Sequence, residues 1–251
     1  MNDAPSRPSL PDVAVFCLDI RCFGPQGRTL LSASDCARLT TMTTARRRLH
    51  YEAGRALTRF ALRRWTGHPA ESLRLLSAPS GKLECRGGPP ISVSHSGHLA
   101  VCAIARAGRV GTDVQFPVPG RRTSAIAEQY FSAEEAEWQA QDAPGRFYML
   151  WVLKEAYLKA TSLGIPGGLD RLTCRIAPPT IEAKVAGNGA IPHLALYTVD
   201  DAFLAVATLD HGLSRIGVEL WNPDGPSSSA RSSVRLLAAT DEILTARAAN
   251  V

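Results

Sequence analysis

The sequence has few of the features that mark secreted, membrane or zinc-binding proteins. No apolar run approaches the roughly 20 residues that span a bilayer, and residues 1–12 lack the basic start and apolar stretch of a secretory signal. The six cysteines form no CxxC pair and no Cys/His set at zinc spacing. We therefore expect a reduced cytoplasmic protein without membrane association, in which the thiols behave as small apolar side chains.

Aromatic residues and lysines are also scarce. Phe, Trp and Tyr make up only 6% of the chain, which disfavours a nucleic-acid binder that stacks bases on aromatic rings. The basic residues are nearly all arginine, and the only lysines are Lys82, Lys154, Lys159 and Lys184. The net charge of +5 still favours an anionic partner: nucleic acid, a phosphorylated cofactor or an acidic protein. A basic nucleic-acid-binding protein is one hypothesis, and it predicts an affinity that falls steeply with salt.

The length of 251 residues allows one large domain or two smaller ones. A Pro/Gly-rich segment at 116–122 is the best candidate for a boundary, and each side of it has a long helical pattern followed by several strand patterns. We expect an α+β fold of two pseudo-symmetric α/β lobes, each a small, mostly antiparallel sheet packed on a long helix. The predicted N-terminal lobe is 1–116, the C-terminal lobe is 117–221, and 222–251 is a flexible Pro/Ser/Gly-rich tail.

Local patterns predict the elements. Helical spacing predicts helices at 44–65 and 147–163, and the capping box of Ser132 and Glu135 begins another that runs to about residue 141. A short amphipathic helix is expected at 234–248. Alternating apolar residues predict strands at 12–20, 91–97, 99–106, 109–116, 171–177, 193–199, 203–209 and 215–220. We expect the last four of these strands to form a second sheet.

The two long helices carry the charged candidates. The helix at 44–65 has a face of arginines that could meet an anion: Arg46, Arg47, Arg48, Arg55, Arg59, Arg63 and Arg64. The helix at 147–163 places Trp151, Glu155 and Lys159 on one face at i, i+4 and i+8, beside an apolar stripe of Met149, Val152, Leu153, Ala156 and Ala160. Alone, a Glu–Lys pair at this spacing is an ordinary surface pair worth only ~0.3–0.5 kcal/mol.

Further oxygen and nitrogen groups extend this pattern. Asp113 and Gln115 share one face of a predicted strand. With Glu155 they supply hard oxygen donors, which suit Mg²⁺, or Mn²⁺ as a substitute, bound together with phosphate oxygens. Lys82 lies in a turn-rich loop and His95 at the end of a strand. Each residue has an ordinary structural explanation, but together they favour a metal site that binds a polyphosphate.

These residues resemble the motifs of the 4′-phosphopantetheinyl transferase superfamily. GTDVQ at 111–115 resembles its G-[IV]-D-[IV]-E motif, and WVLKEAYLK at 151–159 fills every fixed position of W-x-x-K-E-[AS]-x-x-K. ISVSHSG at 91–97 is similar to the N-[IV]-S-H-S stretch, with Ser92 in place of Asn, and the GK at 81–82 matches a basic position before it. The resemblance spans about residues 10–210, and the length suits the two-lobed, monomeric surfactin-type branch.

The resemblance implies a reaction and its partners. Coenzyme A would bind between the lobes, and a serine of an apo acyl or peptidyl carrier protein would attack its β-phosphate. The products would be 3′,5′-ADP and a carrier bearing the phosphopantetheine arm. No nucleic acid or membrane is involved in this chemistry.

The resemblance also implies residue roles. Asp113 and Glu155 would hold Mg²⁺, with Glu155 as the candidate base, acting directly or through a water. Lys159 would stabilise charge on the attacked phosphate, and Ser94 with His95 would contact phosphates. The adenosine 3′-phosphate and nearby groups would be held by Lys82, Arg48 and Arg55, with Arg46 and Arg47 as equal candidates for the place of Arg48.

One position departs from the family motif. Gln115 stands where the family has a third acid. A carboxamide can donate an oxygen to a cation but adds no negative charge and cannot act as a base. We therefore expect weaker metal binding and a mechanism centred on Glu155. The alternative is a pseudoenzyme that binds coenzyme A without transferring its arm, and Mg²⁺-dependent turnover distinguishes the two.

Overall fold

A computed structural model describes residues 11–69, 72–78, 81–141, 145–164, 168–210, 215–223 and 233–241. The helices are α1 (Pro25–Arg28), α2 (Ala33–Leu39), α3 (Ala45–Thr66), α4 (Thr123–Tyr130), α5 (Ala133–Ala140) and α6 (Gly145–Thr161), with 3-10 turns η1 (Ile20–Cys22) and η4 (Leu169–Arg171). The strands are β1 (Val13–Asp19), β2 (Leu75–Ser77), β3 (Leu83–Cys85), β4 (Ile91–Ser96), β5 (Leu99–Ala105), β6 (Arg109–Gln115), β7 (Leu172–Ala177), β8 (Thr180–Val185), β9 (His193–Val199), β10 (Ala202–Leu209), β11 (Ile216–Leu220) and β12 (Val234–Ala239).

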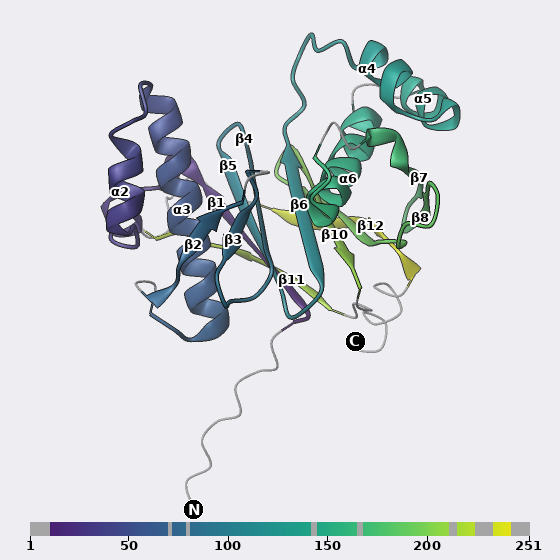
Figure 1. The fold of residues 1–251 in the computed structure, drawn as a ribbon. Helices are drawn as coiled ribbons and strands as arrows, with labels where there is room; N and C mark the ends of the chain where they lie inside the picture. The colour runs from purple at the N-terminus through teal and green to yellow at the C-terminus, as the bar shows by residue number, and fades with distance from the viewer. Residues whose placement is uncertain are drawn as a thin grey trace, which may run out of the picture.

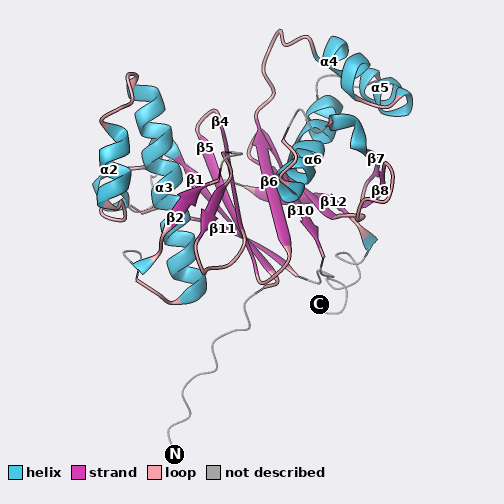
Figure 2. Cartoon of the chain, in the orientation of Figure 1, coloured by secondary structure: helices cyan, strands magenta, loops and turns pink. Residues whose placement is uncertain are grey.

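The strands form two larger sheets and a small hairpin, and each larger sheet packs on one long helix (Figures 1 and 2). The first sheet has the order β11-β1-β5-β4 and packs on α3, while the second has the order β6-β10-β9-β12-β8-β7 and packs on α6. Most neighbouring strands are antiparallel, with β1–β11 and β8–β12 as parallel pairs. The predicted α+β fold of two lobes, each a mostly antiparallel sheet on a long helix, is confirmed.

The cores follow the two-residue alternation of the strands. On β1, Ala14, Phe16 and Leu18 pack toward α3 in one apolar cluster, whereas Val13 and Val15 belong to a cluster shared with the second sheet. A third cluster lies between the second sheet and α6. The central strands of both sheets are therefore buried on both faces, with the helices outside and a common core between the sheets, whereas β7 and β8 have one exposed face.

The edges of the two sheets meet at β4 and β6, which lie side by side in Figure 1. Three alternate serines of β4 bond by their side chains to β6 or to Phe116 directly after it, because residues at i, i+2 and i+4 face the same way. Ser92 Oγ accepts from the backbone N–H of Thr112 (3.0 Å), Ser94 Oγ donates to Asp113 Oδ1 (2.6 Å), and Ser96 Oγ accepts from the backbone N–H of Phe116 (3.1 Å). The SxSxS pattern thus joins the lobes.

Two strands belong to sheets that local sequence does not predict. Residues 216–220, expected in the second sheet, form β11 and pair in parallel with β1 of the first sheet, so that prediction is wrong. β6, expected to continue from β5, instead pairs with β10 of the second sheet. The lobe division at 1–116, 117–221 and 222–251 stays a prediction, although the sheets do not divide at these positions.

The segment at 234–239 is a strand, and the predicted helix there is wrong. β12 pairs antiparallel with β9 and meets β8 at Ala239. Ala238 and Ala239 are fully buried, and the backbone N–H of Ala239 donates to the carbonyl of Pro179 at 3.0 Å. Long-range pairing has overridden the local helical pattern. The remainder of the predicted tail, at 224–232 and 242–251, lies outside the described residues.

The two long helices are more deeply buried than an amphipathic pattern predicts. α6 buries residues on nearly all sides, including Lys154 and Glu155, whereas Met149 of the predicted stripe is partly exposed. Such a helix is buried on most of its surface, whereas an amphipathic helix has one exposed polar face. On α3, Arg59 was predicted on the basic face, but it is buried and paired with Asp35 at 2.8 Å. Within the described ranges, no helix has the length and hydropathy needed to cross a bilayer.

Candidate active site

The site begins where α6 crosses β6 at Gly111. A Cβ atom at this position would overlap the carbonyl oxygen of Ala156 and come within 2.5 Å of the amide nitrogen of Ala160. Only glycine permits this approach of helix to strand. The consequence is that Asp113, two residues along β6, lies beside the helical turn that carries Glu155 and Lys159.

Asp113 is the best-connected side chain of the site. It is 6% exposed, and its Oδ1 accepts hydrogen bonds from Lys159 Nζ and from Ser94 Oγ, both at 2.6 Å. The three residues come from β6, α6 and β4, so the carboxylate joins both lobes. The structure therefore brings together three of the residues that the sequence singled out.

Glu155 is the second buried carboxylate, at 9% exposure. Burial raises the pKa of Glu155 above its usual range, and the negative charge of Asp113 raises this pKa further, while Lys159 and Arg121 oppose the shift. Two carboxylates that repel each other in a buried position favour binding of a cation between them. This donor chemistry fits a hard divalent ion such as Mg²⁺.

Among the described residues, a third acid is absent from this cluster. Within the part of the chain that the structure describes, no three His, Cys, Asp or Glu side chains are grouped closely enough to hold a metal. Gln115, predicted as the third oxygen donor, instead lines the adjacent cleft. The protein's own donors at the site are thus two carboxylates with a neutral amide nearby.

Two neighbouring cavities open at the seam between the two lobes, where β4 meets β6. The smaller, of about 470 Å³, is lined by Glu155 and Lys159 of α6, Lys82 of the β2–β3 loop and Ser92 of β4. The larger is a cleft of about 1090 Å³ between α2, α3, the β2–β3 hairpin and the end of β4. Both include Gly81, Leu83 and Val93 in their walls. An elongated ligand could therefore occupy both at once.

The larger cleft is strongly basic. Its lining includes Arg46, Arg47 and Arg55 of α3 and Arg38 of α2. Arg55 lies over the ring of Tyr51 at 5.1 Å and 3.5 Å from Asp35, and its buried Nη1 has no hydrogen-bond partner among the described residues. An unmatched buried guanidinium donor of this kind suits an anionic ligand.

Arg48 is placed differently from its neighbours. Its Nη1 donates to the carbonyl oxygen of Met42 at 2.7 Å, and Arg48 does not appear in the lining of the cleft, whereas Arg46 and Arg47 do. The two alternatives that the sequence left open therefore lie nearer the cleft than Arg48.

Lys82 and His95 both lie at the cavity walls. Lys82 Nζ donates to the carbonyl oxygen of Lys159 at 3.0 Å and to Ser162 Oγ at 3.2 Å, so it caps the end of α6 from the other lobe. Burial lowers the pKa of Lys82, although Glu84 opposes the shift. Burial and the charge of Lys159 lower the pKa of His95, which lines the larger cleft.

Lys154, also part of the W-x-x-K-E motif, points away from these cavities. Its Nζ lies 2.9 Å from Glu135 Oε2 and donates to the carbonyl oxygens of Leu169 and Leu172. The carboxylate of Glu135 is also bonded to the backbone N–H of Ser132 in the predicted capping box. Lys154 is therefore a buried anchor that fixes α6 to α5 and β7.

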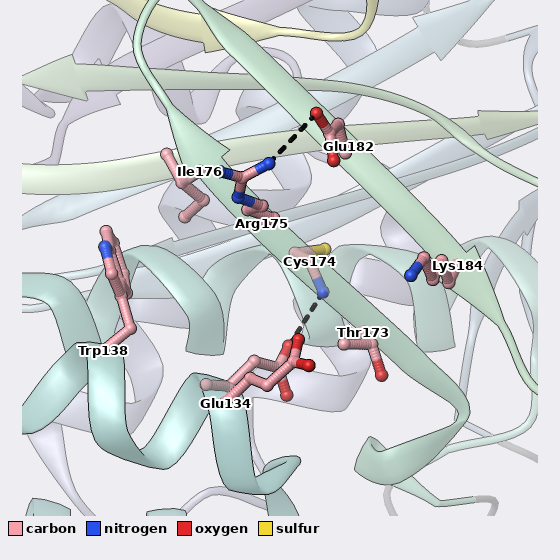
Figure 3. Close-up of a pocket in the computed structure, with 9 residues that line it drawn as sticks. Glu134, Trp138, Thr173, Cys174, Arg175, Ile176, Glu182 and Lys184 are labelled. Atoms are coloured by element: carbon pink, nitrogen blue, oxygen red, sulfur yellow. Dashed lines mark hydrogen bonds and ion pairs between the residues drawn. The ribbon is translucent and has the colours of Figure 1, made fainter.

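A third pocket, of about 190 Å³, lies between α5 and the β7–β8 hairpin (Figure 3). Two of the charges on its rim are paired with each other, since Arg175 Nη1 lies 3.6 Å from Glu182 Oε1. The buried Glu135 at its base accepts from the backbone N–H of Cys174 at 2.8 Å. None of the sequence-predicted site residues lines this pocket.

Sequence reasoning missed three charged or polar residues of the site. Arg38 and His50 line the large cleft, and Arg121 lies over the ring of Trp151 at 4.8 Å within electrostatic reach of Glu155. Their only local signals were the helical spacing of His50 after Arg46 and the paired arginines after Gly120. Neither signal indicates where in the folded site the side chain lies.

Comparisons with known proteins identify the family. A family model described as the 4′-phosphopantetheinyl transferase superfamily matches residues 109–206. The 4′-phosphopantetheinyl transferase psf-1 of Bacillus pumilus is 33% identical over 163 residues, which cover 62% of this chain and 69% of that protein. The 4′-phosphopantetheinyl transferase HetI of Nostoc sp. is 28% identical over 192 residues, or 72% of this chain and 80% of HetI.

The chain therefore belongs to the 4′-phosphopantetheinyl transferase superfamily, and it is an enzyme of that class. The matched range 109–206 contains the Gly111–Ala156 crossing and the cluster of Asp113, Glu155 and Lys159. The sequence-based assignment is confirmed, and two lobes in one chain agree with the surfactin-type branch.

Proposed function

We propose that this enzyme transfers the 4′-phosphopantetheine arm of coenzyme A to a serine of an apo acyl or peptidyl carrier protein and releases 3′,5′-ADP. The observation that carries the proposal is the contact of Lys159 with Asp113 at 2.6 Å, beside the buried Glu155 and the 470 Å³ cavity. A carboxylate pair with one ammonium suits a diphosphate and its counter-ion. The basic cleft that adjoins this cavity suits the adenosine end of the same ligand.

Asp113 and Glu155 would hold a Mg²⁺ ion, or Mn²⁺ in its place, with Gln115 as a neutral oxygen donor. The bound ion would neutralise charge on the diphosphate of coenzyme A. The mutual repulsion of the two carboxylates supports this assignment, because a cation between them relieves it. The absence of a third acid predicts modest affinity for the ion.

The remaining residues would orient the phosphates and move one proton. Lys159 would bind the oxygens of the β-phosphate, and Ser94 and His95 would contact the phosphates from β4. As the bond between the serine oxygen and the β-phosphorus forms, the bond from that phosphorus to the oxygen shared with the α-phosphate breaks. The hydroxyl proton passes to Glu155, directly or through a water, and the electron pair leaves with 3′,5′-ADP.

The adenosine 3′-phosphate would lie in the large cleft. Arg55, with its unmatched Nη1, would bind it together with Arg46 or Arg47 rather than Arg48. Lys82, which lines the smaller cavity, would reach it from the β2–β3 loop, whose Gly81 and Leu83 belong to both walls. A monomeric state, a cytoplasmic location and the lack of a nucleic-acid partner stay predictions.

The test is the intact mass of apo carrier proteins of the fatty-acid, polyketide and peptidyl types after incubation with the enzyme, coenzyme A and Mg²⁺. We expect a gain of one phosphopantetheine group that is lost with EDTA. We also expect loss of transfer by at least about 100-fold in Glu155→Ala and in Lys159→Met, since each removes a group that acts on the reacting atoms.

Lys184→Met is the matched control for charge, because Lys184 is exposed on β8 and far from the seam in the fold. It should retain full transfer. If coenzyme A binds but no carrier of any type gains mass, the chain is the coenzyme A-binding pseudoenzyme and the proposed reaction is wrong.

A further inference from the structure

A pair of imidazoles lies on the wall of the large cleft. His50 of α3 and His95 at the end of β4 have ring centroids 5.1 Å apart and planes at 82°. Both line the cleft of about 1090 Å³. The His50 imidazole has no hydrogen-bond or ion-pair partner among the described residues, and the family motifs give it no role.

Most of the charged groups that face the two imidazoles are cations, and the nearby carboxylates are already bound by basic side chains. Arg38 of α2, Arg46 and Arg47 of α3, and Lys159 of α6 bring cations. The nearby acids are paired: Asp35 of α2 binds Arg59 at 2.8 Å, and Asp113 of β6 binds Lys159 at 2.6 Å. Burial, His95 and Arg46 together lower the pKa of His50. An anion bound in the cleft beside the two rings would reverse these effects, since it favours the protonated form.

An anion bound at His50 would be distinct from one bound at Lys159. His50 and His95 line the larger cleft, whereas Glu155 and Lys159 line the smaller cavity, and the two spaces share the wall of Gly81, Leu83 and Val93. A ligand that fills both spaces needs two separate anionic groups. Coenzyme A has them: a diphosphate and a 3′-phosphate monoester, which carries close to two charges at neutral pH.

We propose that His50 is a specificity-determining residue that binds, together with His95, the phosphate monoester of the co-substrate. The inference rests on the proposed function and adds to it the residue that distinguishes coenzyme A from 3′-dephospho-coenzyme A. An imidazole suits this task because its charge changes near the second pKa of a phosphate monoester.

The experiment measures calorimetric affinities of the free enzyme for coenzyme A and for 3′-dephospho-coenzyme A. The wild-type enzyme should prefer coenzyme A. His50→Asn should weaken coenzyme A binding about tenfold, as expected for loss of one charge-assisted contact, and leave the affinity for the dephosphorylated compound unchanged. His50→Lys, which keeps a cation at this position, should retain most of the preference.

His98→Asn is the matched control. His98 also pairs with an aromatic ring, that of Phe116 at 4.6 Å, but it is not part of the cleft lining. It should leave both affinities unchanged, and thermal melting should show that all variants fold.

Two results would overturn the inference while leaving the proposed function intact. Either His50→Asn binds coenzyme A as well as the wild type does, or it loses the same factor for both compounds. If the wild-type enzyme binds neither compound, the proposed function fails, and the inference fails with it.

Discussion

Gly111 on β6 and Ala156 on α6 are in backbone contact, so close that a methyl group at Gly111 would overlap the Ala156 carbonyl oxygen. This crossing sets the distance between the strand that carries Asp113 and the helix that carries Glu155 and Lys159. The glycine of the G-x-D motif therefore acts through packing, and its effect on the site is indirect.

Gly111→Ala should destabilise the protein by about 3 kcal/mol, the upper range for overpacking a buried contact. It should also reduce transfer, because α6 must move away from Asp113. Urea unfolding and the carrier mass assay measure the two effects. Gly54→Ala on α3 is the control, because a Cβ there meets nothing within 4 Å, and alanine in a helix is expected to be neutral or stabilising. Equal stability of the two variants would contradict the packing account.

Local sequence predicted the helices α3, α5 and α6, the site motifs and most strands, because these depend on spacing within about ten residues, but α1 and α4 were not among the predicted helices. It failed where pairing joins distant segments: β11 with β1, and β12 between β8 and β9. It also failed for buried charges. Lys154 and Arg59 have the spacing of exposed residues, and only their distant partners Glu135 and Asp35 explain their burial.

Gln115→Glu should strengthen Mg²⁺ binding about fivefold to tenfold and preserve transfer. One added charge near a divalent ion in a partly exposed site contributes about 1 kcal/mol. Calorimetric titration of Mg²⁺ in the presence of coenzyme A measures the affinity, and the mass assay measures transfer. Gln129→Glu, which adds the same charge on the exposed side of α4, should change neither.

Loss of transfer in Gln115→Glu would contradict a mechanism centred on Glu155, since that mechanism needs no neutral group at position 115. Unchanged Mg²⁺ affinity would instead show that residue 115 is remote from the ion. That result would contradict a role for residue 115 as an oxygen donor to the ion and leave its side chain only as part of the wall of the large cleft.

Asp35 should link stability to pH. Burial opposes its ionisation, but hydrogen bonds from Ser32 and Arg59 outweigh burial and hold the pKa of Asp35 below its usual range. A carboxyl group with a lowered pKa in the folded state stabilises the protein above its unfolded pKa of about 3.9. That contribution is lost as the pH falls through the folded pKa.

Asp35→Asn should therefore cost about 3 kcal/mol at pH 7, where it removes the carboxylate that neutralises the buried Arg59, and clearly less near pH 3. Urea unfolding at both pH values measures the difference. Asp201→Asn, at an exposed turn, should show no such pH-dependent cost. A cost for Asp35→Asn that is the same at pH 7 and pH 3 would show that the carboxylate charge is not what stabilises the contact of α2 with α3.

Substitutions on β12 test whether residues 234–239 form a structural element or a flexible tail. Ala238 is fully buried in the cluster under α6, whereas Arg235 on the same strand is exposed. Ala238→Asp should cost more than about 3 kcal/mol, since it buries an unpaired charge, and Arg235→Asp should change stability by less than about 0.5 kcal/mol. Urea unfolding compares them. If both substitutions were neutral, residues 234–239 would behave as the tail that the sequence predicts. A large loss of stability in Ala238→Asp alone would instead show that β12 is needed in the second sheet, where it joins the β7–β8 hairpin to β9.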